Sequence, residues 1–355
     1  MDIECRTLEE DFRKFITFFN YSYSWKETHR RKGGIPVYTE DFVRWYYSPL
    51  SQEERKLFIG AYYNNELVGS LLGLPREFRY HGKEIHGIML VDATIHPKYR
   101  GRYRIMHRIG NLFKQRALSM SYDAIFFFVG KMTLVRYWER FFSSYKYKLQ
   151  RIGTFNIFTR ILDLPLFKRW NRFKEAVEFD AEAFSKFFEH KYEESLKKHI
   201  RHFDEEKDLG QCTRLLNSIQ KKVNLAKYWR AEKLAKQLSY PSVSFTLVIE
   251  INNKIEGIIN YHIENYKDKF LAPFARIDTI YFGSVDAEEK ECFVSETLED
   301  MKAKGCIVVT LPELGYFDET PFIRNGFALT PGELWLYGVF RKPDIVISPQ
   351  SEVYV

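Results

Sequence analysis

The sequence has no long apolar run. Its longest ones, such as AIFFFVG at residues 124–130, have the length of a buried strand and are too short to span a bilayer. The N-terminus reads MDIECRTLEEDFRKF and is charged from its second residue, so it lacks the apolar core of a signal peptide. We therefore expect no membrane insertion.

Cysteine is scarce and scattered. The 4 cysteines are Cys5, Cys212, Cys292 and Cys306, and no two of them form a Cys-x-x-Cys pair. This spacing is typical of neither a zinc site nor a disulfide framework. The cysteine usage predicts a protein of the reducing cytoplasm with no metal site.

The sequence also lacks a strong charge of one sign. Its formal net charge is +7, from 54 Lys and Arg residues against 47 Asp and Glu residues. Such a mild excess permits an anionic ligand but does not predict a nucleic-acid surface. Hydrophobic residues make up 45% of the 355 residues, enough for more than one packed core.

A repeated pattern divides the chain. Residues 58–73 read FIGAYYNNELVGSLLG and residues 246–261 read TLVIEINNKIEGIINY, each a strand, an Asn-Asn turn and a second strand. Asn tolerates positive φ, so Asn-Asn suits a tight hairpin. Downstream, LVDATI at 90–95 matches RIDTIY at 276–281, with an Asp near the middle of each strand. The matching order predicts duplication of one α+β unit.

The duplication gives the expected boundaries. We expect a first unit at residues 1–164, a connector at 165–200, a second unit at 201–345 and a tail at 346–355. The connector is highly charged and has aromatic residues at roughly helical spacing, which predicts a helix partly packed on the body.

The stretch IHPKYRGRYRI, from Ile95 to Ile105, lies between an expected strand and an expected helix. This arrangement resembles the GCN5-related N-acetyltransferase (GNAT) superfamily, whose signature loop follows the fourth strand. Residues 95, 97 and 99–102 fit the pattern, whereas Tyr103 and Ile105 stand where small residues are usual. The resemblance implies an α+β fold of two GNAT-like units, each a mixed, mostly antiparallel twisted sheet flanked by helices, with a degenerate second unit.

The same resemblance implies a site for acetyl-CoA or another acyl-CoA. In the family, backbone N–H groups of this loop and the N-terminus of the following helix bind the cofactor pyrophosphate. Guanidinium groups suit phosphate oxygens. The bulk of Tyr103 and Ile105, in contrast, would narrow the space through which the pyrophosphate approaches the loop. A solvated basic loop is the alternative. The cofactor-binding residues implied are Ala93, Thr94 and Ile95 on the strand edge, and Arg100, Gly101, Arg102, Tyr103, Arg104 and Ile105 in the loop.

The equivalent loop of the second unit, VDAEEKE at residues 285–291, is acidic. Its carboxylates would repel a pyrophosphate, but they suit the first turn of a helix. We therefore expect cofactor binding in the first unit only.

Two residues are candidates for proton transfer in the attack of an amine on a thioester. Asp92 lies in an apolar strand, where burial raises a carboxyl pKa, and is the candidate base. A structural Asp at a strand bulge, like Asp278 in the second unit, is an equal alternative. Tyr137 is the candidate acid, although Trp138 stands where the family usually has Tyr, and aromatic packing is the alternative.

The resemblance implies a coenzyme A-dependent N-acyltransferase that transfers acetyl to a primary amine of a small molecule or amino sugar. Two alternatives stay open. One is a FemABX-like aminoacyl-tRNA-dependent transferase, which pairs two such units without a coenzyme A loop but needs a tRNA surface. The other is a non-catalytic acyl-CoA-binding or scaffold protein, which Tyr103, Trp138 and Phe142 favour.

Overall fold

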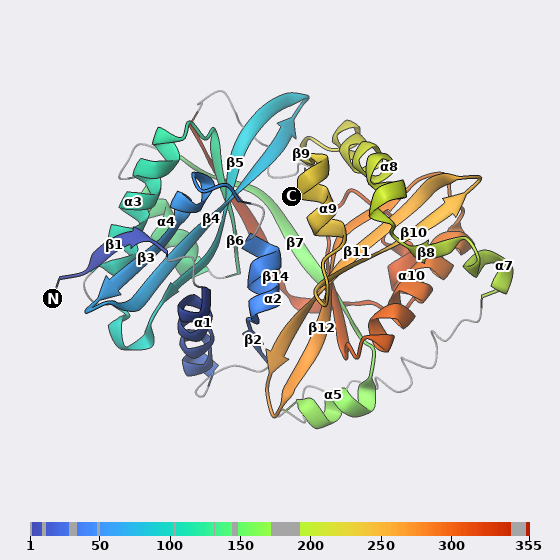
Figure 1. The fold of residues 1–355 in the computed structure, drawn as a ribbon, viewed down its shortest axis with the longest axis horizontal. Helices are drawn as coiled ribbons and strands as arrows, with labels where there is room; N and C mark the ends of the chain where they lie inside the picture. Colours follow the sequence, from blue (N-terminus) through green and yellow to red (C-terminus); the bar gives the residue numbers. More distant parts are fainter. Residues whose placement is uncertain are drawn as a thin grey trace.

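One continuous sheet runs through the whole molecule, with helices on both of its faces (Figure 1). The structure is a computed structural model. It describes residues 2–8, 12–27, 34–47, 50–101, 104–130, 132–143, 148–171, 192–341 and 353–355. None of the helices in these ranges has the length and apolarity needed to cross a membrane.

The first half of the chain alternates helices with strands. In chain order its elements are β1 (Glu4–Thr7), α1 (Phe12–Glu27), β2 (Ile35–Val37), α2 (Glu40–Tyr47), η1 (Glu54–Leu57), β3 (Phe58–Tyr63), β4 (Glu66–Tyr80), β5 (Lys83–Ile95), η2 (Pro97–Tyr99), α3 (Ile105–Ser119), β6 (Ala124–Val129), α4 (Met132–Ser143) and β7 (Leu149–Ile161).

The second half repeats this order. After α5 (Leu164–Trp170) and α7 (Glu194–Lys197) come β8 (Ile200–His202), α8 (Glu205–Ser218), η4 (Ile219–Lys221), β9 (Leu225–Tyr228), α9 (Ala231–Leu238), β10 (Ser244–Ile251), β11 (Lys254–Lys267), β12 (Leu271–Phe282), α10 (Ala287–Ala303), β13 (Val308–Pro312), α11 (Thr320–Arg324), β14 (Ala328–Phe340) and β15 (Val353–Tyr354). Of the expected connector, residues 172–191 lie outside the described residues, as do residues 346–352 of the expected tail.

The two halves exchange strands. The sheet order is β1-β3-β4-β5-β6-β14-β7-β13-β12-β11-β10-β8, so the last strand of each half pairs with the penultimate strand of the other. Two short strands also cross over, because β9 pairs with β4 and β2 pairs with β11. The halves are therefore joined by backbone hydrogen bonds at several places. A boundary near residue 164 divides the sequence but does not divide the sheet.

Both predicted hairpins form with the expected turns. Asn64 and Asn65 have φ of 49° and 64°, and Asn252 and Asn253 have φ of 52° and 60°. A hairpin turn with two residues at positive φ matches the twist of the flanking strands. The prediction of tight Asn-Asn hairpins is therefore confirmed.

Helices pack on both faces of each half because alternate strand residues point to opposite faces. In β4, Leu71 packs with α3 and α4, whereas Leu72 packs with α1 and α2. In β11, Ile259 packs with α10 and α11, whereas Ile258 packs with α8 and α9. The sheet thus forms the middle layer between these helices.

Candidate functional site

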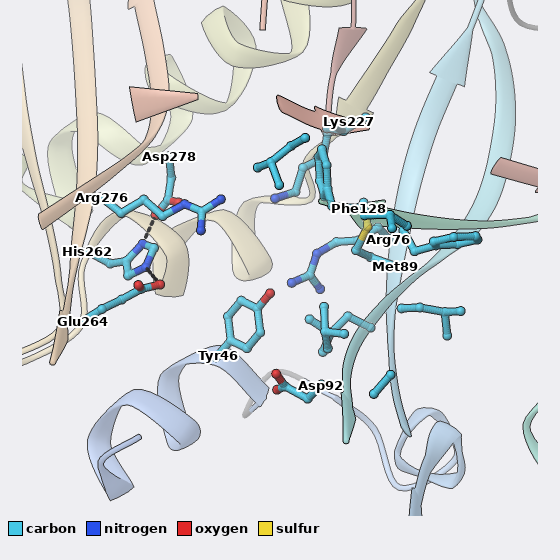
Figure 2. A pocket seen from close by; sticks show the side chains of 18 of the residues that line it. Tyr46, Arg76, Met89, Asp92, Phe128, Lys227, His262, Glu264, Arg276 and Asp278 are labelled. Carbon is cyan, nitrogen blue, oxygen red and sulfur yellow. Dashed lines mark hydrogen bonds and ion pairs between the residues drawn. The ribbon is translucent and has the colours of Figure 1, made fainter. Parts of the chain in front are cut away.

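A cavity of about 640 Å³ lies where the two halves meet. Its walls come from α1, α2, β4, β5, β6 and α4 of the first half and from β9, β11, β12 and β14 of the second. Figure 2 shows its charged side chains, which reach inward from both halves. Tyr354 and Val355, at the end of the chain, line it as well.

Asp92 lies on the wall of this cavity, at an irregularity of β5. The pairing of β4 with β5 shifts between Ser70 and Leu72, which leaves Asp92 as a bulged residue with φ of 51°. Asp is one of the few residues that visits this conformation, and bulges redirect side chains next to active sites. Asp278 occupies the equivalent shift in β12, so both Asp residues predicted near strand centres lie at bulges.

Two phenols hold the Asp92 carboxylate. The Tyr38 hydroxyl donates to Oδ1 at 2.9 Å, and the Tyr47 hydroxyl donates to Oδ2. Burial raises the pKa of Asp92 to about 6, while these two hydrogen bonds oppose the shift. A carboxyl group with such a pKa is suited to accept a proton near neutral pH.

The strands beside Asp92 separate. β5 and β6 pair in parallel only from Gly87 to Met89, opposite Ala124 to Phe126. Beyond that point both strands line the cavity, β5 with Leu90 to Ala93 and β6 with Phe127 to Val129. Among the expected cofactor residues of β5, Ala93 faces the cavity, while Thr94 and Ile95 pair with β4 on their other side.

The loop after β5 is open at Gly101. Gly101 has φ of 71°, and a Cβ built there would meet no atom within 4 Å. The Arg100 guanidinium donates to the carbonyl oxygens of Ile95 at 3.2 Å and Ser22 at 2.9 Å, which ties the loop to α1. Arg104, with φ of 49°, precedes the first turn of α3 and is exposed.

Ile105 differs from its expected role. Its side chain is 1% exposed and packs in the core, where it would meet a Cβ at Gly69 at 2.8 Å. The expectation that Ile105 narrows the phosphate approach is therefore wrong, because the side chain points into the core. Arg102 and Tyr103 lie outside the described residues.

The α4 aromatics reach the same cavity as Asp92. Tyr137 and Trp138 both line it, and their ring centroids lie 5.3 Å apart. Trp138 is 7% exposed and packs on Phe127 at 5.4 Å, as expected of an aromatic packed against the sheet. The structure thus brings the candidate base and the candidate acid to one cavity.

The equivalent opening of the second half is filled. The Tyr316 hydroxyl accepts a hydrogen bond of 3.1 Å from the backbone N–H of Ile280, two residues after the bulge. Asp286 begins α10 with a capping box, in which its side chain and that of Glu289 exchange hydrogen bonds with backbone N–H groups. The prediction that the acidic loop forms a structural first turn is therefore confirmed.

The sequence analysis missed the charged residues of the far wall. Arg76 of β4, Lys227 of β9 and Arg276 of β12 line the cavity beside His262 of β11. The signal in the sequence was weak, because Glu77 adjoins Arg76 and Asp278 lies two residues after Arg276. What the sequence did not reveal is that three separate strands bring them together.

His262 lies between two carboxylates. Its Nδ1 is 2.5 Å from Asp278 Oδ2, and its Nε2 is 2.9 Å from Glu264 Oε1. Burial alone would lower the pKa of His262, but the two carboxylates outweigh burial and raise it to about 9. Burial likewise opposes the charge of Glu264, yet the imidazolium holds the pKa of Glu264 at about 2. The three groups form a hydrogen-bonded cluster with His262 at its centre.

Comparisons with known proteins agree with this geometry. Residues 5–123 match the family model described as Acetyltransferase (GNAT) domain. No match was found among the curated proteins searched by sequence.

Solved structures resemble the chain over almost its whole length. Saccharomyces cerevisiae N-myristoyltransferase with bound myristoyl-CoA is 15% identical, with a TM-score of 0.74 over 99% of this chain and 84% of that one. A GCN5-related N-acetyltransferase from Kribbella flavida is 10% identical, with a TM-score of 0.54 over 95% of this chain and 70% of that one. A GCN5-related N-acetyltransferase from Anabaena variabilis is 10% identical, with a TM-score of 0.55 over 95% of this chain and 72% of that one.

At these identities the solved structures establish the fold, and the family model covers the part of the chain that carries Asp92 and the Gly101 loop. The chain therefore has a GNAT-like fold of two like-ordered α+β halves, and residues 5–123 of its first half match the Acetyltransferase (GNAT) domain model.

Proposed function

We propose that the protein is a coenzyme A-dependent N-acyltransferase that transfers acetyl from acetyl-CoA to a primary amine of a small molecule or amino sugar. The observation that carries this proposal is Asp92, held by two phenols on a bulge beside the separated ends of β5 and β6. The family match over residues 5–123 supports the same chemistry.

The first half fits an acyl-CoA. Gly101 leaves open space at the loop, Arg104 is exposed next to the N-terminus of α3, and Ala93 presents β5 to the cavity. Backbone N–H groups at a helix N-terminus and a nearby guanidinium suit a diphosphate. We assign cofactor binding to Ala93, Thr94 and Ile95 and to the loop from Arg100 to Ile105.

Asp92 is the general base and Tyr137 the general acid of the proposal. When bound, acyl-CoA supplies a thioester whose carbonyl carbon the amine nitrogen attacks, so that a C–N bond forms and the C–S bond breaks. Asp92 takes the proton that the amine loses, and Tyr137 gives a proton to the departing thiolate. Burial raises the pKa of the Asp92 carboxyl to about 6, which makes it a stronger base and still leaves it mostly ionised at pH 7.

The acyl chain length is tested directly. Purified protein is assayed for free thiol release with acetyl-CoA and with myristoyl-CoA against a panel of amines. We expect amine-dependent thiol release with acetyl-CoA. A preference for myristoyl-CoA would support acyltransferase activity but show that the transferred group is not acetyl. No amine-dependent thiol release with either acyl-CoA would overturn the proposal.

Asp92→Asn tests the assigned base. We expect kcat to fall about 100- to 10,000-fold, because the variant loses proton acceptance while it keeps a side chain of the same shape. Asp163→Asn, at the N-cap of α5, is the control and leaves kcat unchanged. Full turnover in Asp92→Asn would remove Asp92 from the mechanism.

A further inference from the structure

The far wall of the cavity carries three positively charged side chains. Arg76, Lys227 and Arg276 all line it, and Figure 2 shows their charged ends pointing toward the same region, with Tyr46 between them and Asp92. No described side chain forms an ion pair with any of the three. Three cations thus face one space.

The contacts that these cations do make are weak substitutes for an anion. Arg76 donates to the carbonyl oxygen of Pro75 at 3.0 Å, and the Lys227 ammonium lies 3.7 Å from the centre of the Trp229 ring. Both interactions leave the net charge in place. A cation held in a cavity wall without a counter-charge costs free energy, which a bound anion would recover.

The nearby carboxylates are already engaged. Asp278 and Glu264 clamp the His262 imidazolium, and Glu264 also accepts a hydrogen bond of 2.8 Å from Tyr266. They act on Arg276 only at longer range, where their charges outweigh burial and raise its pKa. Across the cavity, Asp92 is held by its two phenols. These carboxylates therefore form no ion pair with any of the three cations.

Burial works against the other two cations. It lowers the pKa of Arg76, and burial together with the charge of Arg76 lowers the pKa of Lys227 well below its usual range. An anion placed between them reverses this effect, because an opposite charge favours the protonated form. A bound anion would therefore stabilise the protonated forms of Arg76 and Lys227.

We propose that Arg76, Lys227 and Arg276 bind an oxyanion, a carboxylate or a phosphate, carried by the acceptor amine. This inference about the acceptor rests on the proposed acyltransferase activity, in which the acceptor presents its amine to Asp92. The arrangement separates two recognition elements across one cavity, a carboxylate for the amine and a cationic wall for the anion. Guanidinium groups suit both oxyanions through paired N–H donors.

Pairs of acceptors that differ only in the anion test the inference and identify its source. β-Alanine is compared with β-alaninamide, and O-phosphoethanolamine with ethanolamine, each with acetyl-CoA. We expect kcat/KM to be at least about tenfold higher for the charged member of one pair, as expected for losing a charged hydrogen bond. A preference in the first pair indicates a carboxylate, and in the second a phosphate; equal values in both pairs overturn the inference.

Variants that remove one charge from the far wall test whether these cations cause the preference for a charged acceptor. Arg76→Gln and Arg276→Gln should raise KM for the charged acceptor by about ten- to a hundredfold, without a comparable change in kcat or in KM for its neutral partner. Arg79→Gln is the matched control, because Arg79 lies on β4 but pairs with Glu84 outside the cavity. Equal effects on charged and neutral acceptors would overturn the inference.

A binding measurement separates this inference from the proposed function. The protein without acyl-CoA is titrated calorimetrically with sodium acetate and with inorganic phosphate. We expect one anion to bind, and to bind about tenfold or more weakly to Arg76→Gln, with a folding midpoint no lower than that of the wild type. If anions bind but no amine is acylated, only the enzyme proposal fails; if amines are acylated but neither anion binds, only this inference fails.

Discussion

Asp92 shows how one side chain is tuned by effects of opposite sign. Burial raises its pKa, the hydrogen bonds from Tyr47 and Tyr38 lower it, and the charge of Glu264 raises it again. The result is about 6, between that of an exposed carboxyl group and that of a buried, unsupported one. The phenols therefore keep the carboxylate usable as a base at neutral pH.

The pH dependence of the reaction should report this balance. Because the base must be ionised, we expect kcat/KM to fall as pH drops through about 6. Tyr47→Phe removes a donor to the charged form, so this limb should move to higher pH by about one unit or more, since such a hydrogen bond contributes roughly 1.5–3 kcal/mol. A pH profile of each variant measures the shift, and an unmoved limb would contradict the assignment.

The same pKa has a consequence for folding. Because the folded-state pKa is raised from 3.8, the contribution of Asp92 to stability is fully present below about pH 4 and is lost as pH rises through about 6. Asp92→Asn has no such titration, so its unfolding midpoint should rise relative to that of the wild type as pH increases from about 4 to above 6.

At the scale of single elements, glycines on β4 set the distance between α3 and the sheet. A Cβ at Gly73 would lie 2.5 Å from Phe113 and 2.8 Å from Ile88, both buried side chains. A Cβ at Gly69 would meet Ile105. The close packing of α3 holds its first turn beside the Gly101 loop, so these glycines also position the proposed cofactor site.

Two Gly→Ala changes should have opposite effects. Gly73→Ala forces buried rings apart and should lower the free energy of unfolding by about 1–3 kcal/mol. Gly210→Ala, on an exposed position of α8 where the nearest atom lies 3.8 Å away, should raise it by about 0.5–1 kcal/mol. Urea unfolding measures both, and a destabilised Gly210→Ala would contradict the open space assigned there.

The local features were the ones that the sequence could predict. The Asn-Asn turns, the bulged Asp92 and Asp278, and the acidic cap of α10 depend on residues close together in the chain. The placement of Ile105 could not be predicted, because a signature position does not reveal which way a side chain points. Its direction is fixed by the core beneath Gly69.

At the scale of the whole molecule, the exchange of strands could not be predicted from the sequence. β7 and β14 come from a repeated unit, so either one would satisfy the hydrogen bonds of β6. The cationic wall was missed for the same reason, since Lys227 reaches Arg76 only because β9 crosses to pair with β4. Nonlocal pairing fixed both features.

Strand exchange should make the two halves one cooperative unit. Residues 1–164 alone lack β14 and β9, which removes the native partner from one edge of β6 and from one end of β4, so we expect that piece to be unfolded or aggregated. Calorimetry of the full chain should show a single transition with equal calorimetric and van't Hoff enthalpies.

Co-expression provides the complementary arm of this test. Residues 1–171 and 192–355, produced together, should assemble into a folded complex because each supplies strands that the other lacks. A stable, monomeric fragment of residues 1–164 would contradict the interdependence of the halves.

The crossed strands also bear on how such a protein becomes asymmetric. Two identical copies of one unit, trading the same strands, would form a closed dimer whose central hollow sits on the two-fold axis, with the same side chain on both sides. Counted from the Asn-Asn turns, Arg76 in β4 corresponds to Glu264 in β11. When the two copies are joined in one polypeptide, these two positions can carry opposite charges. The Arg76 side of the hollow can then attract an anion that the Glu264 side repels.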